Sequence, residues 1–220
     1  MTPRGAIVFD LDGTLVDTSG DIVAAVNHVR ARLAMPALDR RAVLDEVGHG
    51  AAHLIARTTG VPRDAGARFD EALGAFRGFY KDHQGARSEA YPGVRGMLDA
   101  LRGDFDLYVL SNKPTEAAVR EVGIQGLADC FCAVWGGGSL AAMKPDPAGV
   151  LKALAASGVD ARRGAMVGDL VIDLETGANA GVRPFLVTWG FARPPVGFGA
   201  AYESAETPAE LVEKIERAIP

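Results

Sequence analysis

The sequence predicts an α/β fold in which a parallel sheet core carries an inserted α-helical cap. From about residue 92 onward, short apolar runs alternate with amphipathic helical segments. Strands separated by helices imply right-handed crossovers and therefore parallel pairing. Residues 18–85 instead place apolar side chains only at helical spacing, which predicts a block of helices. We expect a core domain of residues 1–16 and 86–220, and a cap domain of residues 17–85.

The first predicted strand is the apolar run Ala6–Phe9, which ends in a turn signal and is typical of a strand buried on both faces. Helical spacing of apolar residues then predicts four cap helices, around residues 22–33, 43–47, 54–55 and 69–80. The other predicted strands are residues 107–110, 131–135, 165–167 and 185–188. The predicted core helices are residues 94–101, 114–123, 147–156, 172–180 and 208–218.

Composition narrows the range of partners. The chain has 220 residues and a formal net charge of −5, from 23 Lys and Arg against 28 Asp and Glu. Such an acidic chain has no general attraction for nucleic acid or anionic membranes, so we expect neither as a partner. No run approaches the ~20 apolar residues that cross a bilayer, and acidic residues begin at Asp10, too early for a secretory signal. We expect a cytoplasmic monomer or homodimer.

Polar side chains follow the predicted strands at their carboxyl ends, where open parallel sheets bind their ligands. They are Asp10 with Asp12, Ser111 with Asn112 and Lys113, Lys144, and Asp169 with Asp173. Residues two apart on a strand point to the same side, so Asp10 and Asp12 could address one ligand. Each residue alone has an ordinary structural explanation, such as a turn or a helix cap for an aspartate. Agreement across four strand ends favours a site.

The residue types at these ends favour a metal and a phosphoryl group. Clustered carboxylates repel one another, and a divalent cation relieves that repulsion. Oxygen ligands without His or Cys favour a hard ion, most simply Mg²⁺. A lysine and a small hydroxyl beside such an ion suit a phosphoryl group, because both stabilise negative charge on its oxygens.

Four segments resemble the motifs of the haloacid dehalogenase superfamily, in the same order. They are Asp10-Leu11-Asp12-Gly13-Thr14-Leu15, Ser111-Asn112, Lys144-Pro145 and Gly168-Asp169-x-x-x-Asp173. The resemblance implies a Rossmann-like core, a helical cap between the first two motifs, and Mg²⁺-dependent phosphoryl transfer. Carbon–halogen hydrolysis is not expected, because the dehalogenases lack the second aspartate that stands here at Asp12.

The resemblance also implies a role for each residue. Asp10 would be the nucleophile that forms an aspartyl-phosphate, and Asp12 the general acid and then the general base. Ser111, Asn112 and Lys144 would hold the phosphoryl group. The Asp10 carboxylate, the Asp12 main-chain carbonyl and Asp169 would bind Mg²⁺. Asp173 would be a further ligand or, in preference, an outer partner that acts through water or Lys144.

Within the superfamily, further segments resemble the phosphoglycolate phosphatase family. They are Val47-Gly48-His49-Gly50, Tyr91-Pro92-Gly93-Val94, Ser111-Asn112-Lys113-Pro114, Lys144-Pro145-Asp146-Pro147 and Thr188-Trp189-Gly190. The resemblance implies a phosphomonoesterase that acts on a small phosphorylated metabolite, with 2-phosphoglycolate as the expected substrate. One departure is Leu170, because the family usually has Ser or Thr at that position.

Substrate choice is the part of the function that the sequence leaves open. The glycolate carboxylate needs a cationic or amide-rich partner, and the cap offers Gly48, His49 and Gly50 in one loop, with His53 and Arg57 after it. The alternatives with the same chemistry are a sugar phosphatase, a nucleotidase, a pyrophosphatase or a β-phosphoglucomutase. A more distant alternative is a non-catalytic phospho-acceptor signalling domain.

Overall fold

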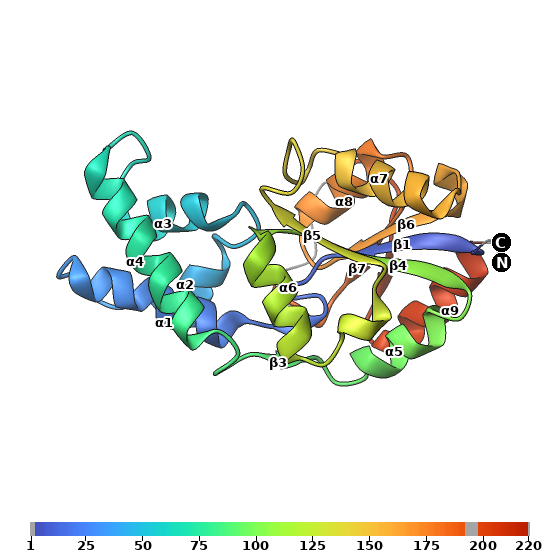
Figure 1. The fold of residues 1–220 in the computed structure, drawn as a ribbon, viewed down its shortest axis with the longest axis horizontal. Helices are drawn as coiled ribbons and strands as arrows, with labels where there is room; N and C mark the ends of the chain where they lie inside the picture. The colour runs from blue at the N-terminus through green and yellow to red at the C-terminus, as the bar shows by residue number, and fades with distance from the viewer. Residues whose placement is uncertain (1–2, 192–197, 220) are drawn as a thin grey trace. The chain divides into compact units, whose positions relative to one another are not determined.

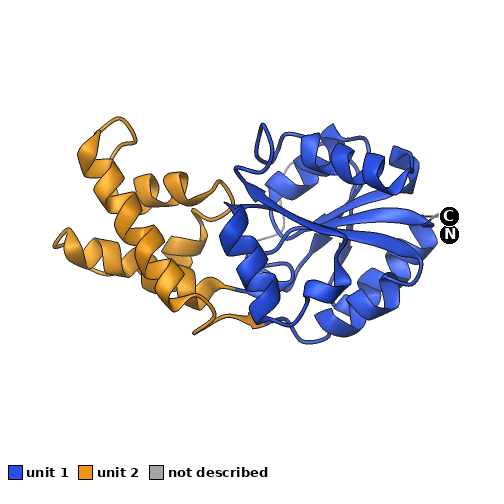
Figure 2. Cartoon of the chain, in the orientation of Figure 1, with its two compact units in different colours: residues 1–17, 90–220 blue, residues 18–89 orange. Residues whose placement is uncertain are grey.

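The computed structural model describes residues 3–191 and 198–219. The chain forms two compact units (Figure 2). Unit 1 consists of Met1–Asp17 and Ala90–Pro220, and unit 2 consists of Thr18–Glu89. The assignment of these units to a catalytic core and a substrate cap stays a prediction.

Unit 1 is built on a six-stranded sheet whose observed pairs are all parallel. Its spatial order is β5 (Ala133–Gly137), β4 (Phe105–Pro114), β1 (Gly5–Phe9), β6 (Gly164–Gly168), β7 (Arg183–Val187) and β8 (Glu203–Ala205). The chain runs from β1 to β4 and β5 on one side, then crosses to β6 on the other side. The winding therefore reverses at β1, and such a switch point opens a crevice at the carboxyl ends of the strands.

Helices cover both faces of this sheet (Figure 1). One face packs against α5 (Val94–Leu101), α6 (Thr115–Ile124) and α9 (Pro208–Ala218), and the other against α7 (Ala148–Ser157) and α8 (Val171–Asn179). Successive β1 side chains alternate between these layers. Ile7 and Phe9 lie in the apolar cluster with α5 and α9, whereas Ala6 and Val8 lie in the cluster with α7. The predicted α/β class with a parallel sheet is confirmed.

Within the six-stranded sheet, the differences from the predicted strands lie at strand ends and at the sheet edge. β4 continues through Ser111, Asn112 and Lys113 instead of ending at residue 110, with a register shift against β5 after Leu110. β5 starts at Ala133 rather than residue 131, because the chain before it forms the short 3-10 turn η1 (Ala128–Cys130). A second 3-10 turn, η2 (Ala161–Arg163), precedes β6. The edge strand β8 escaped prediction because its sequence Glu-Ser-Ala has no apolar pattern.

Unit 2 is helical, with α1 (Ser19–Arg32), α2 (Arg40–Leu44), α3 (Ala51–Thr59) and α4 (Ala67–His83). The apolar face predicted for α4 is buried, and so is that of α1. The Asp21 carboxylate accepts hydrogen bonds from the backbone N–H groups of Gly85 (2.8 Å) and Arg87 (2.9 Å). This contact ties the first turn of α1 to the segment after α4. Two short strands, β2 (Val16–Asp17) and β3 (Glu89–Ala90), pair where the chain leaves and rejoins unit 1.

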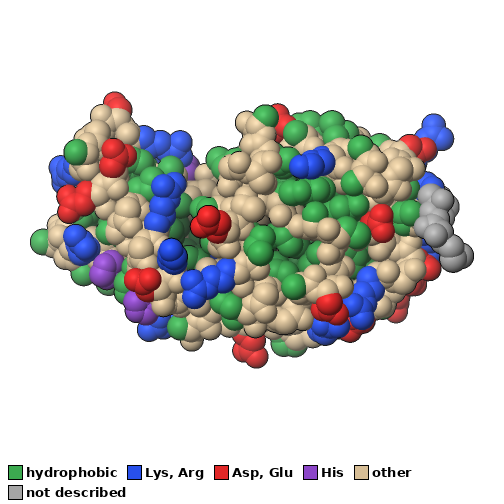
Figure 3. All heavy atoms as spheres, viewed as in Figure 1, with side chains coloured by type: hydrophobic (Ala, Val, Ile, Leu, Met, Phe, Trp, Pro, Cys, Tyr) green, Lys and Arg blue, Asp and Glu red, His purple; other side chains and the backbone are tan. Residues whose placement is uncertain are grey.

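On the face drawn in Figure 3, acidic and basic side chains are interspersed. Ion pairs such as Arg95–Asp129 (2.9 Å) join opposite charges on the surface. Among the described residues, no helix combines the length and the apolar character that a membrane span needs.

Candidate active site

The first cluster of the site follows β1. This strand ends at Phe9, and the Asp10 backbone N–H donates to the Val167 carbonyl of β6 (2.8 Å). A turn begins at once, because the N–H groups of residues 14, 15 and 16 all point to the Leu11 carbonyl. The expectation that a continuing strand aligns Asp10 with Asp12 is therefore wrong. A turn that Gly13 permits through its positive φ of 85° carries Asp12.

Lys144 is the buried cation of the site. Its Nζ atom lies 2.7 Å from Asp10 Oδ1 and 2.7 Å from Asp173 Oδ1. The side chains of all three residues are at most 6% exposed. Asp10 Oδ1 makes this ion pair without a hydrogen bond of suitable geometry. A buried carboxylate oxygen in this condition has capacity for a further ligand.

Burial disturbs the ionisation of the cluster. Desolvation raises the pKa of Asp10 from 3.8 to about 7, although Lys144 acts in the opposite direction. Desolvation, followed by repulsion from Asp173 and Asp10, raises the pKa of Asp169 well above its usual range. Burial opposes the charge of Lys144, yet the carboxylates of Asp10 and Asp173 raise its pKa above the usual value. The cluster thus combines a stable ammonium with carboxylates that lack enough positive charge.

The Asn112 side chain forms a clamp on Lys144. Its Nδ2 donates to the Lys144 carbonyl (3.1 Å), and its Oδ1 accepts from the Lys144 backbone N–H (2.9 Å). Ser111 is buried beside it, and its Oγ accepts from the Lys113 N–H (3.2 Å). Asn112 was predicted to bind phosphate. That role stays a prediction, and in this structure its side-chain amide fixes the loop that delivers the ammonium.

Backbone surrounds the Asp169 carboxylate closely. Its Oδ2 accepts from the Phe191 N–H (2.7 Å), and its Oδ1 accepts from Thr14 Oγ1 (3.3 Å). A Cβ atom at Gly13 would lie 2.4 Å from Asp169 Oδ2, and one at Gly190 would lie 2.5 Å from the same oxygen. Both glycines are therefore needed for the carboxylate to occupy this position.

Asp173 lies in the first turn of α8. Its Oδ2 accepts from the Leu170 N–H (3.1 Å), while its Oδ1 faces Lys144. Leu170 precedes the helix and has no oxygen with which to cap it in return. A Cβ at Gly168 would lie 2.1 Å from the Asp173 carboxyl carbon, so the strand end has room for this aspartate only with glycine there. The Lys144 ammonium occupies Asp173 Oδ1 at 2.7 Å, and a cation already bound there suits an outer role better than a ligand role.

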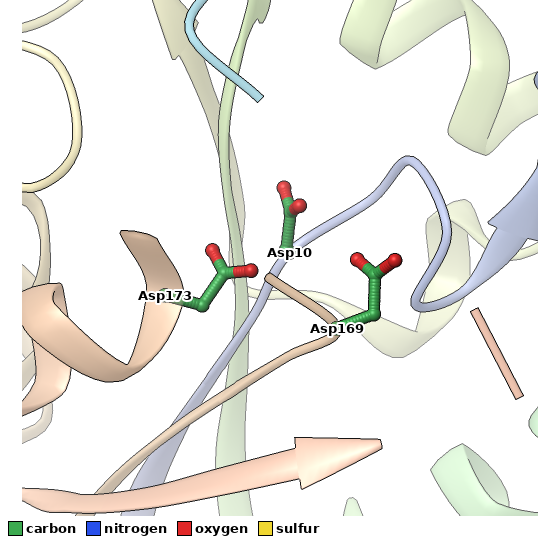
Figure 4. Close-up of side chains that lie close together, drawn as sticks. All are labelled: Asp10, Asp169 and Asp173. Carbon is green, nitrogen blue, oxygen red and sulfur yellow. The ribbon is translucent and has the colours of Figure 1, made fainter. Parts of the chain in front are cut away.

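The three carboxylates can hold a metal ion together (Figure 4). Asp10, Asp169 and Asp173 each offer a ligand oxygen, and these oxygens lie within 4.8 Å of one another. All three residues are buried. Oxygen ligands, an Asp10 oxygen without a hydrogen bond, and the raised pKa values all fit a hard divalent cation.

Two sets of contacts escaped the sequence prediction. Lys113 Nζ lies 2.5 Å from Asp12 Oδ1, and both side chains are largely buried. Thr14, Gly190 and Phe191 surround Asp169, and Trp189 Nε1 donates to the Thr14 carbonyl (3.0 Å). Lys113 and Gly190 follow the predicted ends of strands at residues 110 and 188, and this position could have identified them as site residues. Nothing in the sequence indicates that a backbone N–H of residue 191 binds a carboxylate.

The candidate residues of the cap surround Glu46 within unit 2. Arg57 Nε lies 3.1 Å from Glu46 Oε2, and His53 Nε2 lies 3.3 Å from the same oxygen. The His49 and His53 rings are 4.9 Å apart. Desolvation, and then repulsion from His49, lowers the pKa of His53. Gly48 and Gly50, on either side of His49, have φ values of 115° and 81°.

Comparison with known proteins gives one family. The family model described as haloacid dehalogenase-like hydrolase matches residues 7–187. A phosphoglycolate phosphatase of Cupriavidus necator is 37% identical over 203 residues, which are 90% of this chain and 87% of that protein. An N-acetylmuramic acid 6-phosphate phosphatase of Pseudomonas aeruginosa is 30% identical over 218 residues, which cover 97% and 96% of the two chains.

Solved structures share the fold. The crystal structure of a protein described as a predicted phosphoglycolate phosphatase from Haemophilus somnus superposes with a TM-score of 0.87. It is 25% identical, and the match covers 96% of this chain and 97% of the other.

Proposed function

The chain belongs to the haloacid dehalogenase-like hydrolases, and we propose that it is a Mg²⁺-dependent phosphatase whose substrate is 2-phosphoglycolate. The single observation that carries the chemistry is the buried group of Asp10, Asp169, Asp173 and Lys144. A carboxylate nucleophile, a metal site and a fixed cation are the parts that phosphoryl transfer needs. The relatives named phosphoglycolate phosphatase support the substrate.

Asp10, Asp169 and the main-chain carbonyl of Asp12 are the ligands that we assign to Mg²⁺. Family membership supports a divalent cation, and the choice of Mg²⁺ rests on the all-oxygen donor set. When bound, the ion would neutralise charge on the phosphoryl oxygens and on the carboxylates. Asp173 acts outside this set, because it orients Lys144 through the 2.7 Å ion pair.

The reaction proceeds in two displacements at phosphorus. An Asp10 carboxylate oxygen bonds to phosphorus, the ester P–O bond breaks, and Asp12 gives its proton to the departing glycolate oxygen. Water then bonds to phosphorus, the bond between phosphorus and Asp10 breaks, and Asp12 takes a proton from that water. Lys144 stays protonated and holds negative charge on the phosphoryl group in both steps.

A sugar phosphatase is the second candidate, because the N-acetylmuramic acid 6-phosphate phosphatase covers nearly the whole chain. Gly48, His49, Gly50 and Arg57 are the cap residues that we assign to substrate recognition. The nucleotidase, pyrophosphatase and mutase alternatives, and the signalling domain, have no comparable observation in their favour. The cytoplasmic location and the monomeric or homodimeric state stay predictions.

The test is phosphate release from a panel of esters, measured with Mg²⁺ and with EDTA. The panel holds 2-phosphoglycolate, N-acetylmuramic acid 6-phosphate, glucose 6-phosphate, a nucleoside monophosphate and pyrophosphate. We expect Mg²⁺-dependent release, with kcat/KM for 2-phosphoglycolate at least about tenfold above the others. If kcat/KM is highest for a sugar phosphate, the proposed substrate is wrong, and the proposed phosphatase chemistry stands. Equal activity in Mg²⁺ and in EDTA would contradict the proposed requirement for a divalent cation.

A further inference from the structure

The mechanism above gives no role to the second buried lysine of the site. Lys113 stands in the last part of β4, and its side chain is only 7% exposed. Its Nζ atom lies 2.5 Å from Oδ1 of Asp12, whose side chain is 14% exposed. Lys144 serves Asp10 and Asp173, so the two lysines contact different carboxylates.

The sheet itself brings Lys113 and Asp12 together. β1 and β4 are adjacent parallel strands, with Phe9 opposite Val109. Asp12 comes three residues after Phe9, and Lys113 comes four residues after Val109. The Lys113 backbone is also held, because its N–H donates to Ser111 Oγ (3.2 Å). The ammonium is therefore delivered to Asp12 by the framework of the sheet rather than by a long surface side chain.

A charge-assisted hydrogen bond to one oxygen restricts the rotation of the whole carboxylate. Asp12 lies beyond the end of β1, and the contact with Lys113 joins its side chain to the neighbouring strand β4. Proton transfer requires the donor oxygen within hydrogen-bond reach of the leaving oxygen. Holding Oδ1 determines where Oδ2 lies.

We propose that Lys113 is the positioning residue of Asp12, and that it fixes this carboxylate for proton exchange with the leaving-group oxygen. The inference rests on the proposed function. In the first step the ester P–O bond breaks, and one proton passes from Asp12 to the departing oxygen. Lys113 keeps its own proton throughout. Its contribution is the orientation of Asp12 and not a contact with phosphorus.

The proposal predicts a dependence on the leaving group. An alkoxide such as that of glycolate departs slowly without a proton, whereas 2,4-dinitrophenolate departs readily without one. The experiment measures kcat/KM for 2-phosphoglycolate and for 2,4-dinitrophenyl phosphate at saturating Mg²⁺, because this ratio reports the first displacement and not the hydrolysis step that both esters share. The variants are Lys113→Met, Lys113→Arg and, as a matched control, Lys152→Met, because Lys152 is exposed on α7.

We expect Lys113→Met to lower kcat/KM for 2-phosphoglycolate about 10²-fold, within the range of general acid catalysis. The loss with 2,4-dinitrophenyl phosphate should stay below about threefold. Lys113→Arg should restore part of the alkyl rate, and Lys152→Met should change neither rate. In an Asp12→Asn background, Lys113→Met should have almost no further effect, because the residue that it positions can no longer exchange a proton.

Equal losses with both esters would overturn the proposal and assign Lys113 to the phosphoryl group. A rise in KM for 2-phosphoglycolate with unchanged kcat would overturn it in favour of substrate carboxylate binding. If Lys113→Met does not fold, Lys113→Arg must show the same bias between the esters at smaller size, and an unbiased loss there would overturn the inference. If the wild-type protein prefers another alkyl phosphate, only the proposed substrate is overturned. That alkyl phosphate then takes the place of 2-phosphoglycolate in the comparison with 2,4-dinitrophenyl phosphate.

Discussion

Two charged clusters, one in each unit, are built in opposite ways. In unit 1, one lysine faces an excess of carboxylates, and their side chains are at most 6% exposed. In unit 2, one carboxylate, Glu46, faces Arg57 and His53, and the Arg57 side chain is 62% exposed. The first cluster has fewer positive than negative groups, and its side chains have little exposure to solvent. The second is paired, with an exposed arginine and a partly buried glutamate and histidine.

The difference indicates which cluster can change without loss of the chemistry. Buried charges interact strongly, and losing one partner leaves another uncompensated. Exposed pairs such as Arg57–Glu46 are screened and contribute little to stability. We infer that the buried cluster tolerates almost no substitution, whereas the cap cluster can be altered to accept another substrate.

The largest effect is expected from Asp10→Asn. An amide neither attacks phosphorus nor binds a divalent cation well, so kcat should fall about a thousandfold or more. Phosphate release with 2-phosphoglycolate measures this, with Asp104→Asn as the control at an exposed position before β4. Retention of more than about a tenth of the wild-type rate would contradict covalent catalysis.

A single methyl group should nearly disable the buried cluster. In Gly190→Ala, the new Cβ would meet the Gly13 carbonyl at 2.2 Å and Asp169 Oδ2 at 2.5 Å. We expect the Kd for Mg²⁺ to rise about 10- to 100-fold, because a metal ligand is displaced. Isothermal titration calorimetry measures this. Gly74→Ala in α4 is the control, because its Cβ meets nothing within 4 Å. Unchanged affinity in Gly190→Ala would show that Asp169 is not a ligand.

The buried cluster should also make stability depend on pH. Desolvation raises the pKa of Asp10 in the folded state from 3.8 to about 7. A carboxyl whose pKa is higher in the folded than in the unfolded state stabilises the fold fully at pH values below the unfolded-state pKa. This contribution is lost as the pH rises through the folded-state pKa. Without metal, the Tm should therefore fall between about pH 4 and pH 7 on account of Asp10. Mg²⁺ should raise the Tm more at pH 8 than at pH 5, as measured by thermal denaturation in Mg²⁺ and in EDTA. A shift of equal size at both pH values would contradict this origin.

The cap cluster should respond to Arg57→Ala in specificity and not in stability. The side chain is exposed, so the Tm should hardly change. Loss of one charged contact should lower kcat/KM for 2-phosphoglycolate about tenfold. Arg32→Ala is the control, because Arg32 is also exposed in unit 2 and paired with an acid, Glu71. Equal kinetics in both variants would remove Arg57 from substrate recognition.

The smallest effect is expected from Leu170→Ser. Asp173 already accepts from the Leu170 N–H, and a serine hydroxyl could accept from the first turn of α8 in return. An N-cap of this kind contributes about 1 kcal/mol to the free energy of unfolding. Urea denaturation measures it, with Leu170→Ala to separate the loss of the leucine from the gain of the hydroxyl. Serine and alanine variants of equal stability would contradict the capping argument.

Sequence reasoning reached the fold because apolar periodicity directly reflects burial. The helices 94–101 and 208–218 have the predicted bounds, since Gly93 and Thr207 mark their starts clearly. Polar residues at strand ends identified Asp10, Lys144, Asp169 and Asp173, which the structure brings together. The Lys113–Asp12 contact depends on the register between β1 and β4, and the hydrogen bond from the Phe191 N–H to Asp169 depends on the path of the loop after β7. No local pattern encodes these long-range properties.

The pairing of β2 with β3 matters for how such a chain could diversify. The chain leaves unit 1 through Val16–Asp17 and returns through Glu89–Ala90, and these two strands are hydrogen-bonded neighbours. An insertion whose two ends meet places little demand on the host that carries it. Unit 2 is thus an insertion whose two ends meet at one pair of adjacent strands. If unit 2 is the substrate cap that we propose, recombination at this strand pair would exchange substrate recognition and leave the buried cluster of unit 1 unchanged.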